Sequence, residues 1–262
     1  MPLQLPNFPA NPECDGKQWA VIDEDHLAML AALVLIGRAK HAENVLAGTQ
    51  RTVTIVPDAL KEQLRRQLQT AAGPPTYHRD GLLFEIISWI AARITAAPNE
   101  LISTPHLKST QQGLDTIKVG FDPTERNVTR VVVYEQKCTE HARNRFRDEV
   151  IPAFDEWKSH KRDNQLVQAV TSLVERFDLK DDEELRLYDR LVQAHPLAFQ
   201  AALTVTPTPF ETARCVALFE GFIAVTPDIA NRLGDTFPLA DIRGWFATFA
   251  ARVWAKIEAS NV

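Results

Sequence analysis

The chain has 262 residues, of which 45% are hydrophobic and 24% charged, as expected for a globular protein that buries its own core. Its net charge of −5 argues against strong non-specific DNA binding by the chain alone, although a single cleft can still be basic. The three cysteines and seven histidines are scattered without metal-ligand spacing, which favours a reduced setting and surface or core roles for the histidines.

Targeting signals are not evident in the sequence. The N-terminal stretch carries four prolines and no basic region, so we expect no signal peptide there. The longest apolar run, residues 27–37, is about half as long as a membrane span and predicts a buried helix. We therefore expect a cytoplasmic protein with no membrane partner.

Residues 1–79 are predicted to form a mostly helical N-terminal region. Asp58 follows a proline and is a candidate N-cap, and the breaker Ala-Ala-Gly-Pro-Pro at 71–75 ends the helix that Asp58 begins. The predicted elements are an irregular arm (1–22), a helix (26–47), a short β-rich piece (51–56) and a charged helix (58–70).

Residues 80–210 are predicted to form a mixed α/β core in the order helix, three strands, helix, later strand. Asp80 is expected to cap an apolar helix that ends before Pro98, and Pro152 is expected to kink or divide the helix after the third strand. The loop at 122–127 joins the second and third strands as a hairpin. The predicted strands are 103–110, 114–121, 129–137 and 201–206, and the helices after the third strand are 139–159, 164–177 and 181–194.

The C-terminal segment, 211–262, is predicted to be helical. Aromatic and aliphatic residues recur there at spacings of three and four, a stripe that indicates core packing or a docking face for a partner protein. The stripe consists of Ile242, Trp245, Phe246, Phe249, Val253, Trp254 and Ile257.

Asp115, Glu135 and Lys137 form the candidate catalytic centre. Glu135 and Lys137 end an otherwise apolar strand, and their i, i+2 spacing places both side chains on one face. Asp115 begins the neighbouring strand, just after Gly113, which leaves room for a close approach. Carboxylates gathered at one end of a sheet suit Mg²⁺ or Mn²⁺, and a nearby lysine can orient water or stabilise developing charge. The alternative is a solvated strand end with a surface ion pair.

Two further residues complete the candidate metal shell. Glu85 is a carboxylate within the apolar run LLFEIISWI, which suggests that it faces a site. The backbone carbonyl of Gln136 is a candidate further ligand. No Walker A loop, GxGxxG loop or GxSxG elbow is present, so an ATPase, a Rossmann oxidoreductase or a serine hydrolase has no support.

The set Glu85, Asp115, Glu135-x-Lys137, on a helix and two strands, resembles the PD-(D/E)xK nuclease superfamily. The resemblance implies a restriction-endonuclease-like core, but Leu114 stands where that motif usually has proline. More narrowly, 80–210 is similar to HamA-type nuclease subunits of the Hachiman antiphage system. That resemblance implies a HamB-type helicase partner that restrains the nuclease, and broad DNA degradation once it is released.

Basic residues near this centre are candidates for DNA contact. Arg143 and Arg147 are four apart on the following helix, and Lys118 lies on the second strand, so they could reach a phosphate backbone. The alternative is a solvated helix face paired with Asp148 and Glu149.

The sequence therefore predicts a metal-dependent DNA nuclease, the effector subunit of a prokaryotic defence system. The alternative is a non-catalytic interaction subunit that keeps the fold and binds a partner through its helical flanks.

Overall fold

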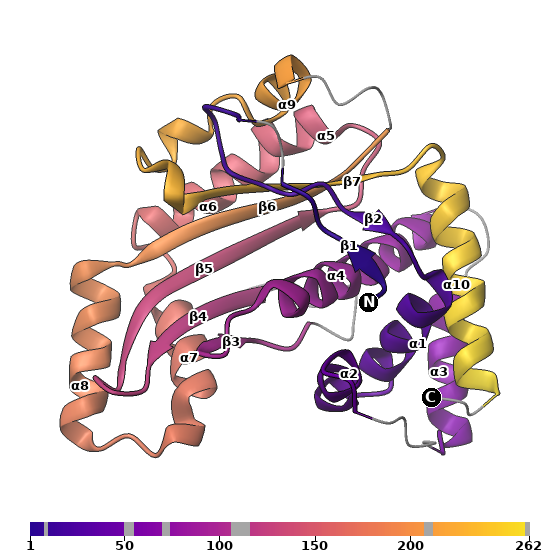
Figure 1. Ribbon diagram of the computed structural model, residues 1–262, viewed down its shortest axis with the longest axis horizontal. Helices are drawn as coiled ribbons and strands as arrows, with labels where there is room; N and C mark the ends of the chain where they lie inside the picture. Colours follow the sequence, from indigo (N-terminus) through magenta and orange to yellow (C-terminus); the bar gives the residue numbers. More distant parts are fainter. Residues whose placement is uncertain (8–9, 50–54, 70–73, 106–115, 207–211, 260–262) are drawn as a thin grey trace.

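A five-stranded mixed sheet forms the centre of the molecule in the computed structural model, with helices on both faces (Figure 1). The structure describes the chain except for residues 8–9, 50–54, 70–73, 106–115, 207–211 and 260–262. The predicted mixed α/β class is confirmed. In sheet order the strands are β3 (Glu100–Ile102), β4 (Thr116–Asp122), β5 (Asn127–Lys137), β6 (Leu197–Val205) and β7 (Arg232–Pro238).

The first three strands are antiparallel, and β5, β6 and β7 are parallel to one another. The predicted hairpin between β4 and β5 is confirmed, with Ile117 opposite Val133. In its turn the carboxylate of Asp122 accepts hydrogen bonds from the amides of Thr124 and Glu125, at 2.7 and 3.1 Å. This Asx-type turn fixes the register that the alternation of apolar side chains also requires.

One face of the sheet is covered by the helices that connect β5 to β6. Pro152 lies in the first turn of α6, and a π-helical turn precedes it. Proline has no amide hydrogen to donate, so it interrupts the regular hydrogen-bond pattern of a helix. The predicted division of this helix is therefore present, as a π-helical turn followed by α6. The elements of the connection are α5 (Ala142–Arg145), η1 (Phe146–Val150), α6 (Ile151–Lys158), α7 (Asp163–Val174), η2 (Glu175–Phe177), α8 (Asp181–Asp189) and η3 (Arg190–Ala194).

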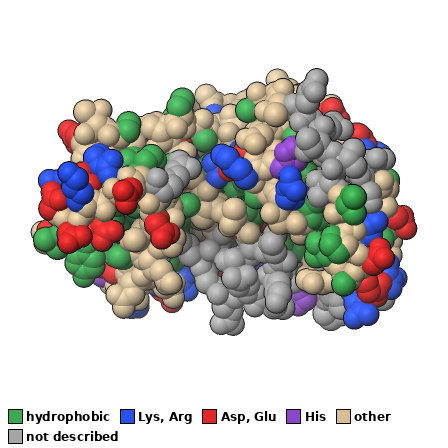
Figure 2. Space-filling model, turned by 90° about the horizontal axis from the view of Figure 1, so that it is seen from below, with side chains coloured by type: hydrophobic (Ala, Val, Ile, Leu, Met, Phe, Trp, Pro, Cys, Tyr) green, Lys and Arg blue, Asp and Glu red, His purple; other side chains and the backbone are tan. Residues whose placement is uncertain are grey.

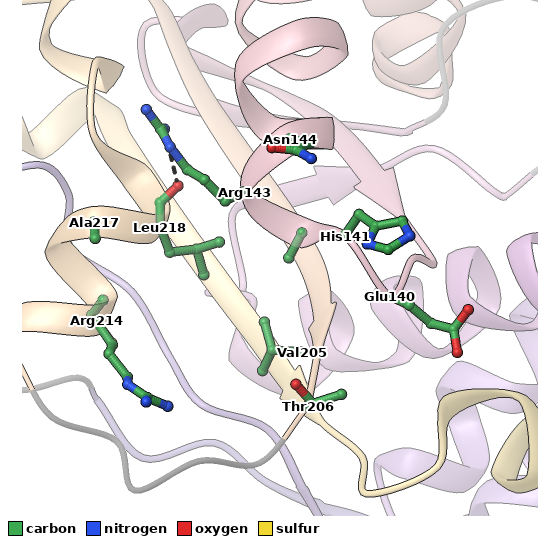
Figure 3. Close-up of a pocket in the computed structure, with 11 residues that line it drawn as sticks. Glu140, His141, Arg143, Asn144, Val205, Thr206, Arg214, Ala217 and Leu218 are labelled. Atoms are coloured by element: carbon green, nitrogen blue, oxygen red, sulfur yellow. Dashed lines mark hydrogen bonds between the residues drawn. The ribbon is translucent and has the colours of Figure 1, made fainter.

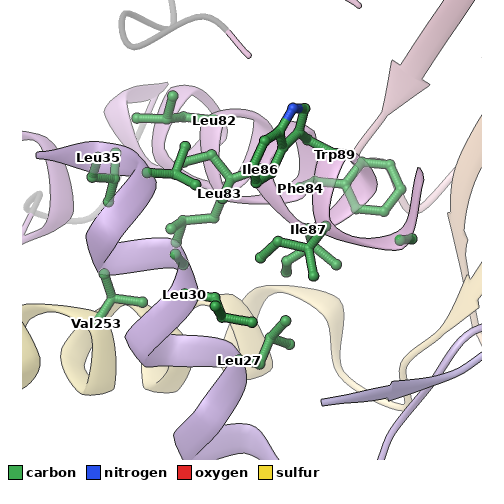
Figure 4. Close-up of a cluster of buried hydrophobic side chains, with 14 of the residues drawn as sticks. Leu27, Leu30, Leu35, Leu82, Leu83, Phe84, Ile86, Ile87, Trp89 and Val253 are labelled. Atoms are coloured by element: carbon green, nitrogen blue, oxygen red, sulfur yellow. The ribbon is translucent and has the colours of Figure 1, made fainter. Parts of the chain in front are cut away.

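The other face is covered by helices from both halves of the sequence. Helix α1 is buried on every side from Leu27 to Leu35, because it packs between α4 and α10 (Figure 4). Leu83 and Ile87 of α4 and Val253 of α10 belong to the same buried cluster. The helices are α1 (Glu24–Leu35), α2 (Ala39–Leu46), α3 (Asp58–Leu68), α4 (Pro74–Thr95) and α10 (Ile242–Glu258).

The C-terminal aromatic stripe belongs to this core. Phe246, Phe249 and Val253 are at most 1% exposed, and Trp245 and Trp254 pack against the cluster while partly exposed. The core interpretation of the stripe is therefore confirmed. Among the helices that the structure describes, none has the length and apolarity needed to span a membrane.

Several predicted boundaries were wrong. The first strand is Glu100–Ile102, and residues 103–105 of the strand predicted at 103–110 are not in a strand, while 106–110 lie outside the described residues. Asp80 does not cap α4, because that helix begins at Pro74 and carries Asp80 inside its second turn. Pro57, not Asp58, occupies the N-cap position of α3. The β-rich piece predicted at 51–56 lies mostly outside the described residues.

The prediction that the C-terminal segment is helical was wrong in part, because the segment contributes the strand β7. Strand β7 contains glycine and three buried polar residues, Arg232, Asp235 and Thr236, so it lacks the apolar alternation that marks a strand in sequence. The segment also contains α9 (Thr212–Phe219) and the short helices η4 (Phe222–Ala224) and η5 (Ile229–Asn231).

The N-terminal arm is also more regular than predicted. It holds a small antiparallel pair, β1 (Leu3–Gln4) with β2 (Ala20–Val21), and between them it runs parallel to β7. The Asp15 amide donates to the Arg232 carbonyl, and the carbonyls of Asp15 and Lys17 accept from the amides of Gly234 and Thr236, over 2.7–3.0 Å. The arm thus covers the outer edge of β7.

Candidate active site

Strand β5 places Glu135 and Lys137 on one face of the sheet, as their spacing predicts. Val131 and Val133, four and two positions before Glu135, are buried against the α5–η1–α6 face, and strand side chains alternate. The parallel neighbour β6 sets Ala201 beside Glu135, and this small side chain leaves space next to the carboxylate. Both polar groups therefore lie under η1, where β5 ends.

Three charged side chains meet at this point. The Lys137 Nζ lies 3.4 Å from Glu135 Oε2 and 3.9 Å from Glu149 Oε2, and Glu149 is also paired with Arg145. The side chain of Glu135 is 11% exposed, that of Lys137 29% and that of Glu149 38%. Lys137 thus bridges a nearly buried carboxylate and one open to solvent.

Glu149 was not predicted as a site residue. It reaches Lys137 from η1, because the π-helical turn and the packing of η1 on the sheet set its direction. Sequence spacing carries no signal for such a contact, because Glu149 and Lys137 lie on different elements.

The predicted partners of Glu135 differ in where the structure places them. Asp115 lies outside the described residues. The β4–β5 ladder is described up to the pair Thr116 and Tyr134, the residue after Asp115 and the residue before Glu135. Glu85 lies half-buried on α4, which packs on the face of Val132 and Tyr134, opposite to that of Glu135. The sheet lies between Glu85 and Glu135, so Glu85 could share a metal ion with Glu135 only around the ends of the strands.

Gln136 lies between the two charged residues and points to the α4 face. Its backbone pairs with Ala202 of β6, so its carbonyl lies in a paired stretch of strand. Its side-chain amide nitrogen and oxygen are both buried, and no hydrogen-bond partner for them lies among the described residues. A buried amide without partners is costly, which is consistent with a site at this strand end that takes a polar ligand.

The basic residues predicted to contact DNA have intramolecular partners. Arg143 donates hydrogen bonds to the carbonyls of Leu218 and Glu220, at 3.3 and 2.7 Å, and so holds α9 against α5 (Figure 3). Arg147 is paired with Asp148 at 2.6 Å, and both side chains are more than half exposed. The predicted pairs with Asp148 and Glu149 are present, although Arg145, not Arg143, contacts Glu149.

Lys118 does not share the face of Glu135. It lies opposite Val132 on the α4 side of the sheet and is paired with Glu100 at 3.1 Å. The structure therefore does not bring Lys118 together with Arg143 and Arg147.

On the surface shown in Figure 2, acidic and basic side chains are mixed over the end formed by α7 and α8.

A cavity of about 390 Å³ opens at the carboxyl end of β6, beside the start of α5 (Figure 3). Its lining includes His141, Arg143, Arg214 and Thr206, but neither Glu135 nor Lys137. Ligands of α/β proteins bind at this end of parallel strands, so the cavity is a place where an anionic substrate could extend from the candidate site.

Buried ionisable groups surround the strand ends. Asp80 is fully buried and lies 2.7 Å from both Arg79 and Arg243. Burial, with the charge of Asp80 adding to it, raises the pKa of the Cys138 thiol to about 12. Burial also raises the pKa of Cys215 to about 11, so neither thiol supplies a thiolate nucleophile at neutral pH.

A second acidic group lies on the α4 face of the sheet. Burial raises the pKa of Asp235 to about 6, although the Lys17 amide and the Gln200 side chain donate hydrogen bonds to its carboxylate. Asp235 also lines a cavity of about 280 Å³ with Lys118 and Arg130.

The candidate metal ligands of the described residues lie in two places. Glu135 and Glu149 supply carboxylates at the end of β5, and the predicted further ligand Asp115 lies outside the described residues. Separately, His160, Asp163 and His195 bring three ligand atoms within 4.8 Å of one another. Burial lowers the pKa of His195, and the neighbouring His160 lowers it further.

Comparison with known proteins assigns no family: no family model, curated protein or solved structure matches the chain.

Proposed function

We propose that this chain is a metal-dependent nuclease that hydrolyses DNA phosphodiester bonds at the end of β5. The observation that supports it best is the contact of Lys137 with Glu135 at 3.4 Å, on adjacent same-face positions of a central strand. Charges are costly in such a strand unless they have a role, and this pair has the chemistry that phosphodiester hydrolysis requires.

The arrangement of elements supports the same proposal. Helix α4, the antiparallel strands β3, β4 and β5, the helices α5–α8 and then β6 parallel to β5 follow the α-β-β-β-α-β order. A restriction-endonuclease-like core has this order, so the PD-(D/E)xK assignment is compatible with it. The defence role and the HamB-type helicase partner rest on the sequence resemblance alone.

Each residue has a defined role in this proposal. Asp115 and Glu135 would hold Mg²⁺ or Mn²⁺, with Glu85 and the Gln136 carbonyl as further oxygen ligands. The bound ion would supply a Lewis acid for the phosphate and an activated water. Lys137, already held beside Glu135, would orient that water or stabilise charge on the phosphate. Hard carboxylate oxygens are the donors that these ions prefer, so the residues present fit them.

DNA cleavage by the purified chain tests the proposal. With Mg²⁺ or Mn²⁺, we expect cleavage of plasmid and linear DNA, reduced at least about 100-fold by Glu135→Gln and by Lys137→Met. Glu184→Gln on α8 is the matched control, because Glu184 is exposed and lies on a different element. Cleavage that survives both substitutions at β5 would show that the site is elsewhere.

A non-catalytic interaction subunit is the second candidate. The low exposure of Glu135 and the use of Arg143 to hold α9 favour it, because both groups already have structural roles. Mn²⁺ binding separates the two functions: a nuclease site raises the melting temperature with Mn²⁺, and Glu135→Gln abolishes the shift. An interaction subunit shows no shift that depends on Glu135.

A further inference from the structure

Two histidines and an aspartate from separate segments meet at the end of the sheet opposite the candidate active site. His160 follows α6, Asp163 is the first residue of α7, and His195 lies between η3 and β6. His195 precedes the first residue of β6, whereas Glu135 and Lys137 lie beside its later residues Ala201 and Leu203. The cluster is therefore distinct from the proposed nuclease site.

The distances within the cluster suit one small cation. His160 Nδ1 lies 2.9 Å from Asp163 Oδ2, and His195 Nε2 lies 3.5 Å from Asp163 Oδ1. Nitrogen and oxygen ligands lie about 2.0–2.2 Å from zinc, and so roughly 3.3 Å from one another in a tetrahedral site. The observed separations lie on either side of that value. The imidazole rings are stacked with centroids 4.1 Å apart, and the three ligand atoms all lie within 4.8 Å of one another.

His195 Nε2 supplies an independent observation. The atom is buried and makes no hydrogen bond of normal geometry with any residue that the structure describes, although it lies 3.5 Å from Asp163 Oδ1. A buried ring nitrogen without a hydrogen bond is costly, and coordination to a cation would satisfy it. His160 is 52% exposed, which leaves a path for an ion to enter and a coordination position for water.

The backbone at both histidines is also unusual. His160 has φ +63° and His195 has φ +47°, in the left-handed region that favours glycine. At His160 the conformation closes a Schellman motif, with the His160 amide bonded to the Trp157 carbonyl and the Lys161 amide to the Glu156 carbonyl. Histidine at two positions where glycine fits best indicates that the side chains are needed.

We propose that His160, Asp163 and His195 form a binding site for a transition-metal ion of the Zn²⁺ type. Two imidazoles with one carboxylate suit Zn²⁺ better than Mg²⁺, which prefers oxygen ligands alone. The ion joins the α6–α7 turn to the start of β6, two segments that are distant in sequence. The site is independent of the proposed nuclease activity.

Zinc titration of the full chain, freed of metal with a chelator, tests the site. We expect one Zn²⁺ per chain by calorimetry, a higher melting temperature with Zn²⁺, and visible absorption bands of a four-coordinate site when Co²⁺ replaces it. His160→Asn and His195→Asn should each weaken Zn²⁺ binding by at least about 10-fold. Asparagine tolerates the left-handed backbone, so both variants keep the local fold.

Two controls separate this site from others on the chain. His78→Gln, at an exposed position on α4, should bind Zn²⁺ like the wild-type chain. Glu135→Gln should also keep Zn²⁺ binding even if it abolishes DNA cleavage. No Zn²⁺ binding by the wild-type chain, or binding that both histidine variants retain, would overturn the proposal and leave His160, Asp163 and His195 as a cluster without metal.

Discussion

At the scale of single residues, the structure buries carboxylates at positions where the sequence pattern does not predict buried charge. Asp235 lies in the centre of β7 with both carboxylate oxygens hydrogen-bonded, and Asp80 is fully buried between two arginines. Glu135 was predicted because its partner Lys137 is only two positions away. Asp235 and Asp80 were not predicted as buried charges, because what buries them comes from distant segments such as the N-terminal arm and α10.

Asp235 should make stability depend on pH. Its folded-state pKa of about 6 is above its ordinary value of 3.8, so the folded state binds the proton more tightly than the unfolded state. Stability from this group is present at low pH and is lost as pH rises through about 6. Asp235→Asn should therefore be more stable than the wild type by about 1–3 kcal/mol above about pH 7, with the gap closing near about pH 4.

Urea denaturation of both chains across this pH range measures the effect. The Gln200 amide can rotate to present its oxygen to an asparagine, so the hydrogen bond to residue 235 is kept in the variant. A stability difference that stays constant with pH would contradict the prediction.

At the scale of elements, the local patterns predicted what local interactions determine. The β4–β5 hairpin, α7 and α10 were found near their predicted positions, because apolar periodicity and turn residues define them. The single helix predicted at 26–47 was wrong, because the chain forms two helices there, α1 and α2, with Gly37 at a positive φ between them. Strand β7 was not predicted, because its pairing with β6 and the N-terminal arm, and not the pattern of its own side chains, determines that it is a strand. In the same way, the cluster of His160, Asp163 and His195 has no spacing motif, because two connections bring it together.

Gly234 shows how tightly β7 is packed. A Cβ there would lie 2.7 Å from Cys14 Sγ and 2.8 Å from Phe219 Cζ, so the arm and α9 both close on this position. Gly234→Ala should destabilise the fold by about 1–3 kcal/mol, as overpacking of a core does. Thermal unfolding followed by circular dichroism measures it.

Gly81→Ala is the matched control for Gly234→Ala. It lies within α4, and a Cβ there would meet nothing within 4 Å. Alanine favours the helix, so this variant should gain about 0.5–1 kcal/mol of stability. Equal effects of the two substitutions would mean that the packing around Gly234 does not restrict it.

At the scale of the whole molecule, one sheet separates two hydrophobic cores. The core on the α5–α8 face comes mainly from the middle of the chain, whereas the other core joins α1 and α4 to the late helix α10 (Figure 1). Asp80 of α4 and Arg243 of α10 add a buried ion pair to that second core. We therefore expect the two halves of the sequence to unfold together, because each core shares the same sheet.

Asp80→Ala tests this coupling. It leaves the guanidinium of Arg79, 8% exposed, without its carboxylate partner, and should destabilise the chain by about 3–5 kcal/mol in a single transition. Arg243→Met should cost less, because Asp80 keeps Arg79 as a partner. Two separate unfolding transitions in Asp80→Ala would show that the cores are independent.

The N-terminal arm that covers β7 has a consequence for synthesis of the protein. Its bonds join residues about 200 positions apart, such as the Lys17 amide and the Asp235 carboxylate. The sheet edge along β7 therefore cannot close until the ribosome has released residues beyond 238, although the arm is made first. Until then the arm has no strand to pair with, so we expect the nascent chain to bind chaperones. We also expect the pairing of these distant segments to limit the rate of folding.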